Sequence, residues 1–177
     1  MPRVFVAVGS NVEPERNLAK AAAELAREFP DVEFSPWYRN KAVGFEGDDF
    51  INLVVAFNTD LPVHDVVAKL REIETACGRP REAPKWAPRS MDLDILLYGD
   101  LVHEEPGLKL PRPDLLKRPF MLGPTADLAP DLRHPTAGAT IGELWQRFDR
   151  ASHTMTRVTP SFTSPRSDPR PPRESGQ

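Results

Sequence analysis

The chain has 177 residues, of which 40% are hydrophobic and 28% charged, a length and composition typical of one globular domain with a sizeable core. The formal net charge is −3, which excludes the strongly basic surface of most proteins that bind nucleic acid or anionic membranes. The single cysteine, Cys77, excludes an internal disulfide bond, and no apolar run approaches the roughly 20 residues of a membrane span. We therefore expect a soluble, cytoplasmic protein without nucleic-acid or membrane partners.

The first half of the chain predicts a strand, a helix and two further strands. Residues 3–11 form a β-rich run that ends in turn residues, and residues 14–29 show helical periodicity. Four apolar residues share one stripe of this helix: Leu18, Ala22, Leu25 and Phe29. Residues 31–40 and 49–59 read as strands on either side of a loop that contains glycine and aspartate.

The second half predicts a helix, a strand, a hairpin and a short helix. Residues 62–77 place their apolar side chains on one helical face, and residues 89–99 read as a buried strand. A short hairpin fits residues 101–110, and a last helix fits residues 140–150.

The order of these elements predicts the fold class. Strand, helix, strand, strand, helix, strand is the order of an α+β, ferredoxin-like βαββαβ fold, in which an antiparallel sheet carries both helices on one face. The opposite face is then free for active-site loops. We expect this domain to span residues 1–150, because residues 151–177 are rich in proline, serine and arginine and predict a disordered tail.

Two aspartates interrupt the buried strand "RSMDLDILLYG" at residues 89–99. Alternate residues of a strand point to the same side, so Asp92 and Asp94 project together. The apolar residues then face the helices: Met91, Leu93, Ile95 and Leu97. Neighbouring carboxylates stay ionised beside a cation, and oxygen ligands favour Mg²⁺; the four histidines show no metal-ligand spacing. The spacing alone is equally compatible with two solvated surface aspartates.

A basic, proline-rich loop precedes these aspartates and contains Arg79, Arg81, Lys85 and Arg89. Cations beside a metal-binding carboxylate pair are what a bound polyphosphate requires. Arg112 and Arg118 extend the cationic surface farther along the chain. A solvated charged loop is the other reading of this segment.

An asparagine lies beside an aromatic residue on the strand at residues 49–59. Phe50 and Asn52 share one face by strand alternation, which suits a flat heterocycle that stacks on the ring and hydrogen-bonds to the amide. Phe120 is a candidate for a second ring. Plain core packing of both phenylalanines is the alternative.

Four blocks in this order resemble the 6-hydroxymethyl-7,8-dihydropterin pyrophosphokinase family. They are "VAVGSN", "YRNKAVGFEGDDFINLVV", "GRPREAPKWAPRSMDLDILLYGD" and "LPRPDLLKRPFMLGPTADLAPD". The resemblance runs from Val4 to about Phe148. It implies an ATP-dependent diphosphotransferase of folate biosynthesis that moves pyrophosphate from ATP to the 6-hydroxymethyl group of the dihydropterin and releases AMP.

The resemblance also implies roles for individual residues. Asp92 and Asp94 hold two Mg²⁺ ions, and Arg79 and Arg89 join them in the catalytic set. The implied ATP-binding residues are Glu74, Arg81, Trp86, Arg89, Ile95, Arg112 and Arg118. The implied pterin-binding residues are Asn40, Val43, Phe50, Asn52 and Phe120. We expect a monomer that binds these two substrates.

Four departures from the family pattern concern the nucleotide side. Arg112 replaces a histidine, Pro113 an aromatic residue and Glu82 a basic residue, and "PTADLAP" stands where the family has P-L-x-E-I-A-P. Arg112, Glu82 and "PTADL" leave open a diverged paralogue that binds pterin or nucleotide without turnover. An RNA-binding sheet is a further alternative for this strand order, but the exposed aromatics and basic face that it needs are missing from the sequence.

Overall fold

The computed structural model describes residues 1–40, 49–77, 91–149 and 155–159. Its strands are β1 (Arg3–Ser10), β2 (Glu33–Phe34), β3 (Trp37–Asn40), β4 (Phe50–Asn58), β5 (Asp92–Tyr98), β6 (His103–Glu105), β7 (Leu108–Leu110) and β8 (Thr156–Val158). Its helices are α1 (Pro14–Glu28), α2 (Val63–Ala76), α3 (Pro119–Leu128) and α4 (Ile141–Arg147), with a 3-10 turn, η1, at Pro113–Leu116. Among these residues, none of the helices is long and apolar enough to cross a membrane.

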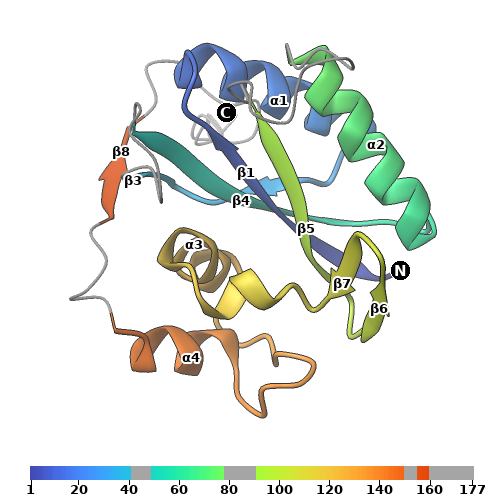
Figure 1. The fold of residues 1–177 in the computed structure, drawn as a ribbon, viewed down its shortest axis with the longest axis vertical. Helices are drawn as coiled ribbons and strands as arrows, with labels where there is room; N and C mark the ends of the chain where they lie inside the picture. Colours follow the sequence, from blue (N-terminus) through green and yellow to red (C-terminus); the bar gives the residue numbers. More distant parts are fainter. Residues whose placement is uncertain (41–48, 78–90, 150–154, 160–177) are drawn as a thin grey trace, which may run out of the picture.

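The main sheet has the strand order β5-β1-β4-β3-β8, and each neighbouring pair is antiparallel. β2 pairs with the other half of β4, so the single strand expected at residues 31–40 is divided in two at Ser35 and Pro36. β1 and β4 lie in the centre, and α1 and α2 cross the same face of the sheet (Figure 1). This arrangement confirms the predicted ferredoxin-like α+β class.

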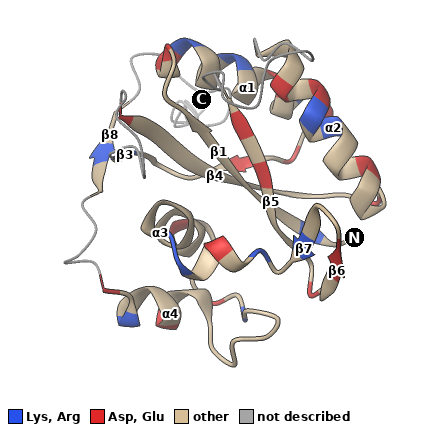
Figure 2. Ribbon diagram, viewed as in Figure 1, with Lys and Arg blue, Asp and Glu red and all other residues tan. Residues whose placement is uncertain are grey.

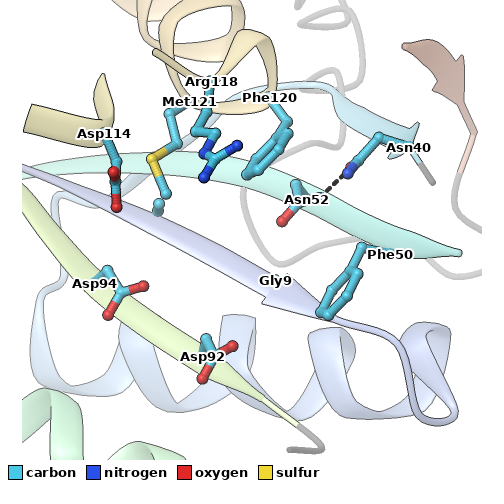
Figure 3. A pocket seen from close by; sticks show the side chains of 11 residues that line it. Gly9, Asn40, Phe50, Asn52, Asp92, Asp94, Asp114, Arg118, Phe120 and Met121 are labelled. Atoms are coloured by element: carbon cyan, nitrogen blue, oxygen red, sulfur yellow. Dashed lines mark hydrogen bonds between the residues drawn. The ribbon is translucent and has the colours of Figure 1, made fainter. Parts of the chain in front are cut away.

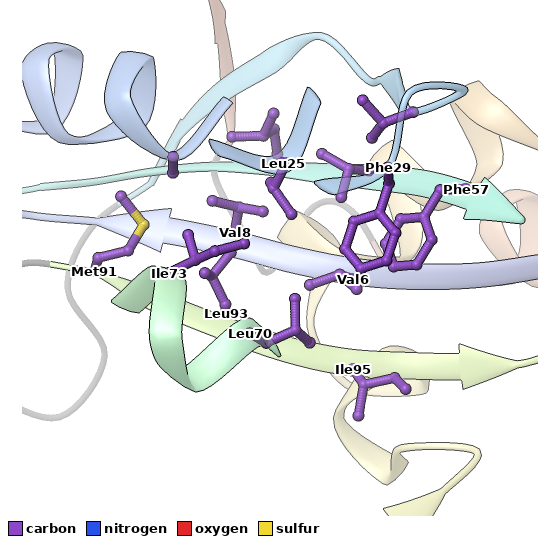
Figure 4. Close-up of a cluster of buried hydrophobic side chains, with 14 of the residues drawn as sticks. Val6, Val8, Leu25, Phe29, Phe57, Leu70, Ile73, Met91, Leu93 and Ile95 are labelled. Atoms are coloured by element: carbon purple, nitrogen blue, oxygen red, sulfur yellow. The ribbon is translucent and has the colours of Figure 1, made fainter. Parts of the chain in front are cut away.

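The core between the sheet and α1 and α2 is built from alternate strand residues. Val6 and Val8 of β1 meet Leu25 of α1 and Leu70 of α2 in one buried cluster (Figure 4). The rings of Phe29 and Phe57 stack within it, with centroids 3.8 Å apart. Cys77 belongs to the same cluster, and burial raises the pKa of its thiol to about 11, which keeps the thiol protonated and supports its interpretation as a core residue.

Helices also cover the opposite face of the sheet, where only loops were expected. α3 packs on β4, and α4 packs on α3 (Figure 1). Val54 and Ala56 of β4 are consequently fully buried in a second apolar cluster with Leu122 of α3. Hydrophobic burial on both faces explains why almost all of β4 is apolar.

The sequence of residues 119–128 did not predict the helix α3. The helix begins at Pro119 and contains Pro124 in its interior. Proline is the poorest helix former because it lacks a backbone N–H. Gly123 adds a second weak helix former, but its missing side chain admits Trp145, whose ring would lie 3.0 Å from a β-carbon there. Tertiary packing stabilises this helix against its local propensity.

A β-bulge corrects the predicted orientation of Leu97. The register pairs Phe5 with Leu97 and Val6 with Ile95, so Leu96 is an extra residue in β5. Ile95 therefore packs toward α1 and α2 as predicted, whereas Leu96 and Leu97 both join the cluster beneath α3.

Part of the predicted disordered tail is ordered. Residues 156–158 form β8, an edge strand that pairs with β3 through Tyr38 and Arg157. Residues 156–158 of the predicted tail are therefore an ordered strand, and the prediction for residues 151–154 and 160–177 lies outside the described part. The predicted hairpin at residues 101–110 is confirmed as β6 and β7.

β5 is an edge strand of this sheet, and a buried carboxylate supports its outer edge. Glu74 of α2, with its side chain 4% exposed, accepts a hydrogen bond from the backbone N–H of Leu93 at 2.9 Å. The same carboxylate accepts two hydrogen bonds from Arg71, at 2.9 and 3.0 Å. Because Leu93 stands between Asp92 and Asp94, this bond fixes the backbone that carries both aspartates.

We expect Glu74→Leu to lower the free energy of unfolding by about 1–3 kcal/mol, because it leaves the buried N–H of Leu93 without an acceptor. Glu74→Gln is the matched control, since its amide oxygen can still accept that bond. Urea denaturation of the two variants measures the difference. Equal stability of the two variants would show that the bond to Leu93 contributes nothing.

Candidate active site

A cleft of about 260 Å³ opens between β5, the central strands and α3 (Figure 3). Polar and aromatic side chains from five elements converge on it. The lining residues are Ala7, Gly9, Asn40, Phe50, Asn52, Asp92, Asp94, Asp114, Arg118, Phe120 and Met121. The cleft lies on the face of the sheet opposite to α1 and α2, where the alternation of Asp92 and Asp94 with Leu93 and Ile95 predicted it.

Strand register arranges the floor of the cleft in rows. Gly9 of β1 pairs with Asp92 on one side and with Asn52 on the other. Since neighbouring strands lie about 4.8 Å apart, the backbones of Asp92 and Asn52 are roughly 10 Å apart. One carboxylate and one amide therefore face a common space that is wide enough for a flat ring and its substituent.

The amide of Asn52 occupies space that Gly9 leaves free. A β-carbon at Gly9 would lie 2.4 Å from Oδ1 of Asn52. The Nδ2 group of Asn52 donates a hydrogen bond to Oδ1 of Asn40, and both residues are 8% exposed. This buried amide pair combines donors and acceptors, which is the chemistry needed to read the edge of a heterocycle.

Two aromatic rings flank this amide pair. Phe50 begins β4 and Phe120 lies in the first turn of α3, and both point into the cleft (Figure 3). α3 is held to the sheet by Tyr38, whose hydroxyl donates a hydrogen bond to Asp127. Burial and this neighbouring carboxylate raise the pKa of Tyr38 to about 12, so the phenol stays protonated and the bond persists across the physiological pH range.

Carboxylates dominate the other end of the cleft. Figure 2 shows acidic bands on β5, and Asp114 of η1 adds a third carboxylate to the lining. Arg112 lies between two of them, with Nη2 3.9 Å from Asp94 and Nε 3.5 Å from Asp114. Its backbone N–H donates to the carbonyl of Leu96 at the β-bulge, which holds this arginine beside β5.

The donor set of Asp92 and Asp94 fits a hard divalent cation. Both carboxylates belong to one face of one strand and line one cleft, and both are partly exposed. Mg²⁺ is typically held by one or two carboxylates together with substrate phosphates. Arg112 and Arg118 add positive charge at the same place, as a bound polyphosphate requires.

A second, smaller cavity lies on the outer edge of β5. It is lined by Val67, Leu70, Arg71, Leu93, Asp94, Ile95, Gly107, Leu108, Lys109 and Arg112. Asp94 thus borders both cavities, and Arg112 joins it in the second. Apolar walls beside three cationic side chains, those of Arg71, Lys109 and Arg112, suit a heterocyclic base that carries phosphates.

Seven of the residues predicted from the sequence line the first cleft: Asn40, Phe50, Asn52, Asp92, Asp94, Arg118 and Phe120. Ile95 and Arg112 border the second cavity instead. Glu74 lines neither cavity, because its carboxylate is bound to the backbone of β5, so the implied contact of Glu74 with ATP stays a prediction. Five predicted residues lie outside the described part of the chain: Val43, Arg79, Arg81, Trp86 and Arg89.

Sequence reasoning missed Gly9, Asp114, Arg71 and Lys109. Gly9 had a usable signal, because a glycine inside a strand often marks a close approach of another group. Asp114 had no such signal in the sequence, since one aspartate in a proline-containing segment looks like an ordinary turn residue. Arg71 and Lys109 come from α2 and β7, and only the fold brings them to the edge of β5.

Comparison with known proteins agrees with this geometry. The family model for 7,8-dihydro-6-hydroxymethylpterin-pyrophosphokinase (HPPK) matches residues 5–130. The chain belongs to this family. Relatives named 2-amino-4-hydroxy-6-hydroxymethyldihydropteridine pyrophosphokinase include one from Synechocystis sp., 40% identical over 148 residues that cover 81% of this chain and 75% of the relative. Another, from Pseudomonas aeruginosa, is 41% identical over 137 residues, which are 75% of this chain and 84% of the relative.

Solved structures show the same fold. A crystal structure of HPPK-DHPS in complex with substrates superposes with a TM-score of 0.63 over 82% of this chain, at 11% identity. Wild-type HPPK-DHPS from Plasmodium falciparum gives 0.62 over 82% of this chain, at 13% identity. This chain spans only 43% and 44% of those two proteins. The likeness supports the ferredoxin-like fold of the HPPK domain, and the family membership confirms the predicted pyrophosphokinase class.

We expect Gly9→Ala to displace the Asn52 amide and to lower the free energy of unfolding by about 1–3 kcal/mol, the usual cost of overpacking. The same substitution in an Asn52→Ala background should cost much less, because the atom that clashes is gone. Urea denaturation of the two single variants and the double variant completes this cycle. Equal costs in both backgrounds would place the clash elsewhere.

Proposed function

We propose that this chain transfers pyrophosphate from ATP to the 6-hydroxymethyl group of 6-hydroxymethyl-7,8-dihydropterin, releasing AMP, as a step of folate biosynthesis. One observation carries the proposal. The carboxylates of Asp92 and Asp94 open into the same cleft as the Phe50 and Phe120 rings and the Asn52 amide. A cation and polyphosphate site therefore adjoins a site for a flat, hydrogen-bonding ring.

The pterin would lie between Phe50 and Phe120. Stacking on two rings supplies contact area, and the buried Asn40–Asn52 pair supplies hydrogen bonds to the ring edge. The ring's hydroxymethyl group would then point along the row from Asn52 across Gly9 to Asp92. The contact of Val43 with the pterin stays a prediction.

Mg²⁺ would be held by Asp92 and Asp94, and the family resemblance implies that two ions bind there. Four carboxylate oxygens are available from this pair, and ATP phosphates would complete the coordination. When bound, such ions neutralise phosphate charge and lower the pKa of a coordinated hydroxyl.

The nucleotide would lie along the outer edge of β5. The second cavity offers Leu70 and Ile95 as apolar surface and Arg71 and Lys109 as cations. Arg112 connects this cavity with the carboxylate end of the first cleft. The contributions of Arg79, Arg81, Trp86 and Arg89 stay predictions, as do a monomeric state and a cytoplasmic location.

The chain's own residues position the two reactants. The hydroxymethyl oxygen forms a bond to the β-phosphorus of ATP, the bond from that phosphorus to the oxygen of the α-phosphate breaks, the hydroxyl proton is released, and AMP leaves. This transfer depends mainly on alignment and charge neutralisation. The aromatic walls and the amide pair fix the acceptor, while Arg112 and Arg118 hold negative charge on the phosphate side.

The decisive assay incubates the purified chain with ATP, Mg²⁺ and 6-hydroxymethyl-7,8-dihydropterin and follows AMP. We expect AMP only when the pterin is present. Binding of both substrates without AMP would instead identify a diverged paralogue without turnover.

We expect Asp92→Asn and Asp94→Asn to fold normally and to lose activity by about 100-fold or more, because even changes around a metal's ligands cost 10–100-fold. Asp100→Asn is the matched control, since this exposed aspartate lies in the turn after β5. Steady-state rates at saturating ATP measure the effect. Full activity in both cleft variants would refute the metal assignment.

A further inference from the structure

Two histidines and a glutamate meet at the surface, apart from both cavities. His64 lies in the first turn of α2, and His103 and Glu105 lie on β6. Nε2 of His103 lies 2.8 Å from Oε1 of Glu105, and Nε2 of His64 contacts the same oxygen. The three ligand atoms lie within 4.8 Å of one another. The sequence did not predict this cluster, because His64 and Glu105 are 41 positions apart in the chain.

The two elements that carry these side chains are separately anchored. Leu108 and Leu110 of the β6–β7 hairpin pack on the main core. The hydroxyl of Tyr98, at the end of β5, donates a 2.6 Å hydrogen bond to the carbonyl of Leu61, just before α2. The hairpin consequently lies beside the beginning of α2 (Figure 1), and the cluster is a built juxtaposition of two fixed elements.

The donor chemistry of the cluster selects a class of metal. His64 and His103 each offer one imidazole nitrogen and Glu105 offers one carboxylate oxygen. Two imidazoles and one carboxylate suit Zn²⁺ and its transition-metal neighbours, whereas Mg²⁺ prefers oxygen ligands alone. Tetrahedral zinc separates its ligand atoms by roughly 3.4 Å, so the contact between His103 and Glu105 would widen by only about half an ångström.

We propose that His64, His103 and Glu105 form a binding site for a divalent transition-metal ion such as Zn²⁺, which fastens the β6–β7 hairpin to the beginning of α2. Three protein ligands leave a coordination position for water. The hairpin and α2 also contribute two of the walls of the second cavity, through Leu108 and Lys109 of the hairpin and Val67 and Leu70 of α2. A bound ion would hold these walls together.

The test titrates Zn²⁺ into the untagged full-length chain by calorimetry, in a millimolar excess of Mg²⁺. We expect one site of 1:1 stoichiometry, and a rise of the melting temperature on adding Zn²⁺. His64→Ala and His103→Ala should weaken binding by more than about tenfold and abolish the rise, since ligand loss exceeds the cost of outer-shell changes. His64→Gln should behave likewise while it retains a hydrogen bond to Glu105.

Two controls locate the ion. Glu104→Gln, which alters the neighbouring carboxylate of β6 that pairs with Lys109, should bind Zn²⁺ as the unaltered chain does. Asp92→Asn should also retain the site, which separates it from the proposed Mg²⁺ site and makes the result independent of the proposed function. Absence of Zn²⁺ binding, or binding unchanged in the histidine variants, would overturn the proposal.

Discussion

The constraint on which this structure depends is that each central strand serves two different covered faces. Alternate residues of β1 and β4 enter the core beneath α1 and α2, and the residues between them enter the space beneath α3. A strand can satisfy both faces only if its register is fixed, because a slip of one residue exchanges them. The cleft uses the same alternation: Gly9, Asn52 and Asp92 form a row only in this register.

Electrostatics concentrates the chemistry at the edge of the sheet. The carboxylates of Asp92, Asp94 and Asp114 repel one another. Arg112 lies beside both Asp94 and Asp114, and its positive charge offsets part of this repulsion. A central strand, covered on both faces, could hold such charges only at a large desolvation cost. β5 is an edge strand, so its aspartates remain partly exposed and accessible to a cation that arrives with phosphate.

The outer edge of β5 is itself supported by several elements. Glu74 binds the backbone N–H of Leu93, and the segment that follows β7 binds the carbonyl of Leu96 through Arg112. These contacts close an edge that would otherwise be open to pairing with another chain. The second cavity lies along the same edge, where residues of the hairpin, α2 and β5 line it. The elements that support this strand therefore also line a cavity beside it.

The sequence by itself determined the order of elements, the face on which Asp92 and Asp94 stand, and the pairing of Phe50 with Asn52, because periodicity is a local property of the chain. It also carried the family resemblance. Only the tertiary structure decided the rest: the helix α3, the bulge at Leu96, the role of Gly9 and the cluster around Glu105. Each of these depends on contacts between residues far apart in the chain, and burial there overrides local propensity.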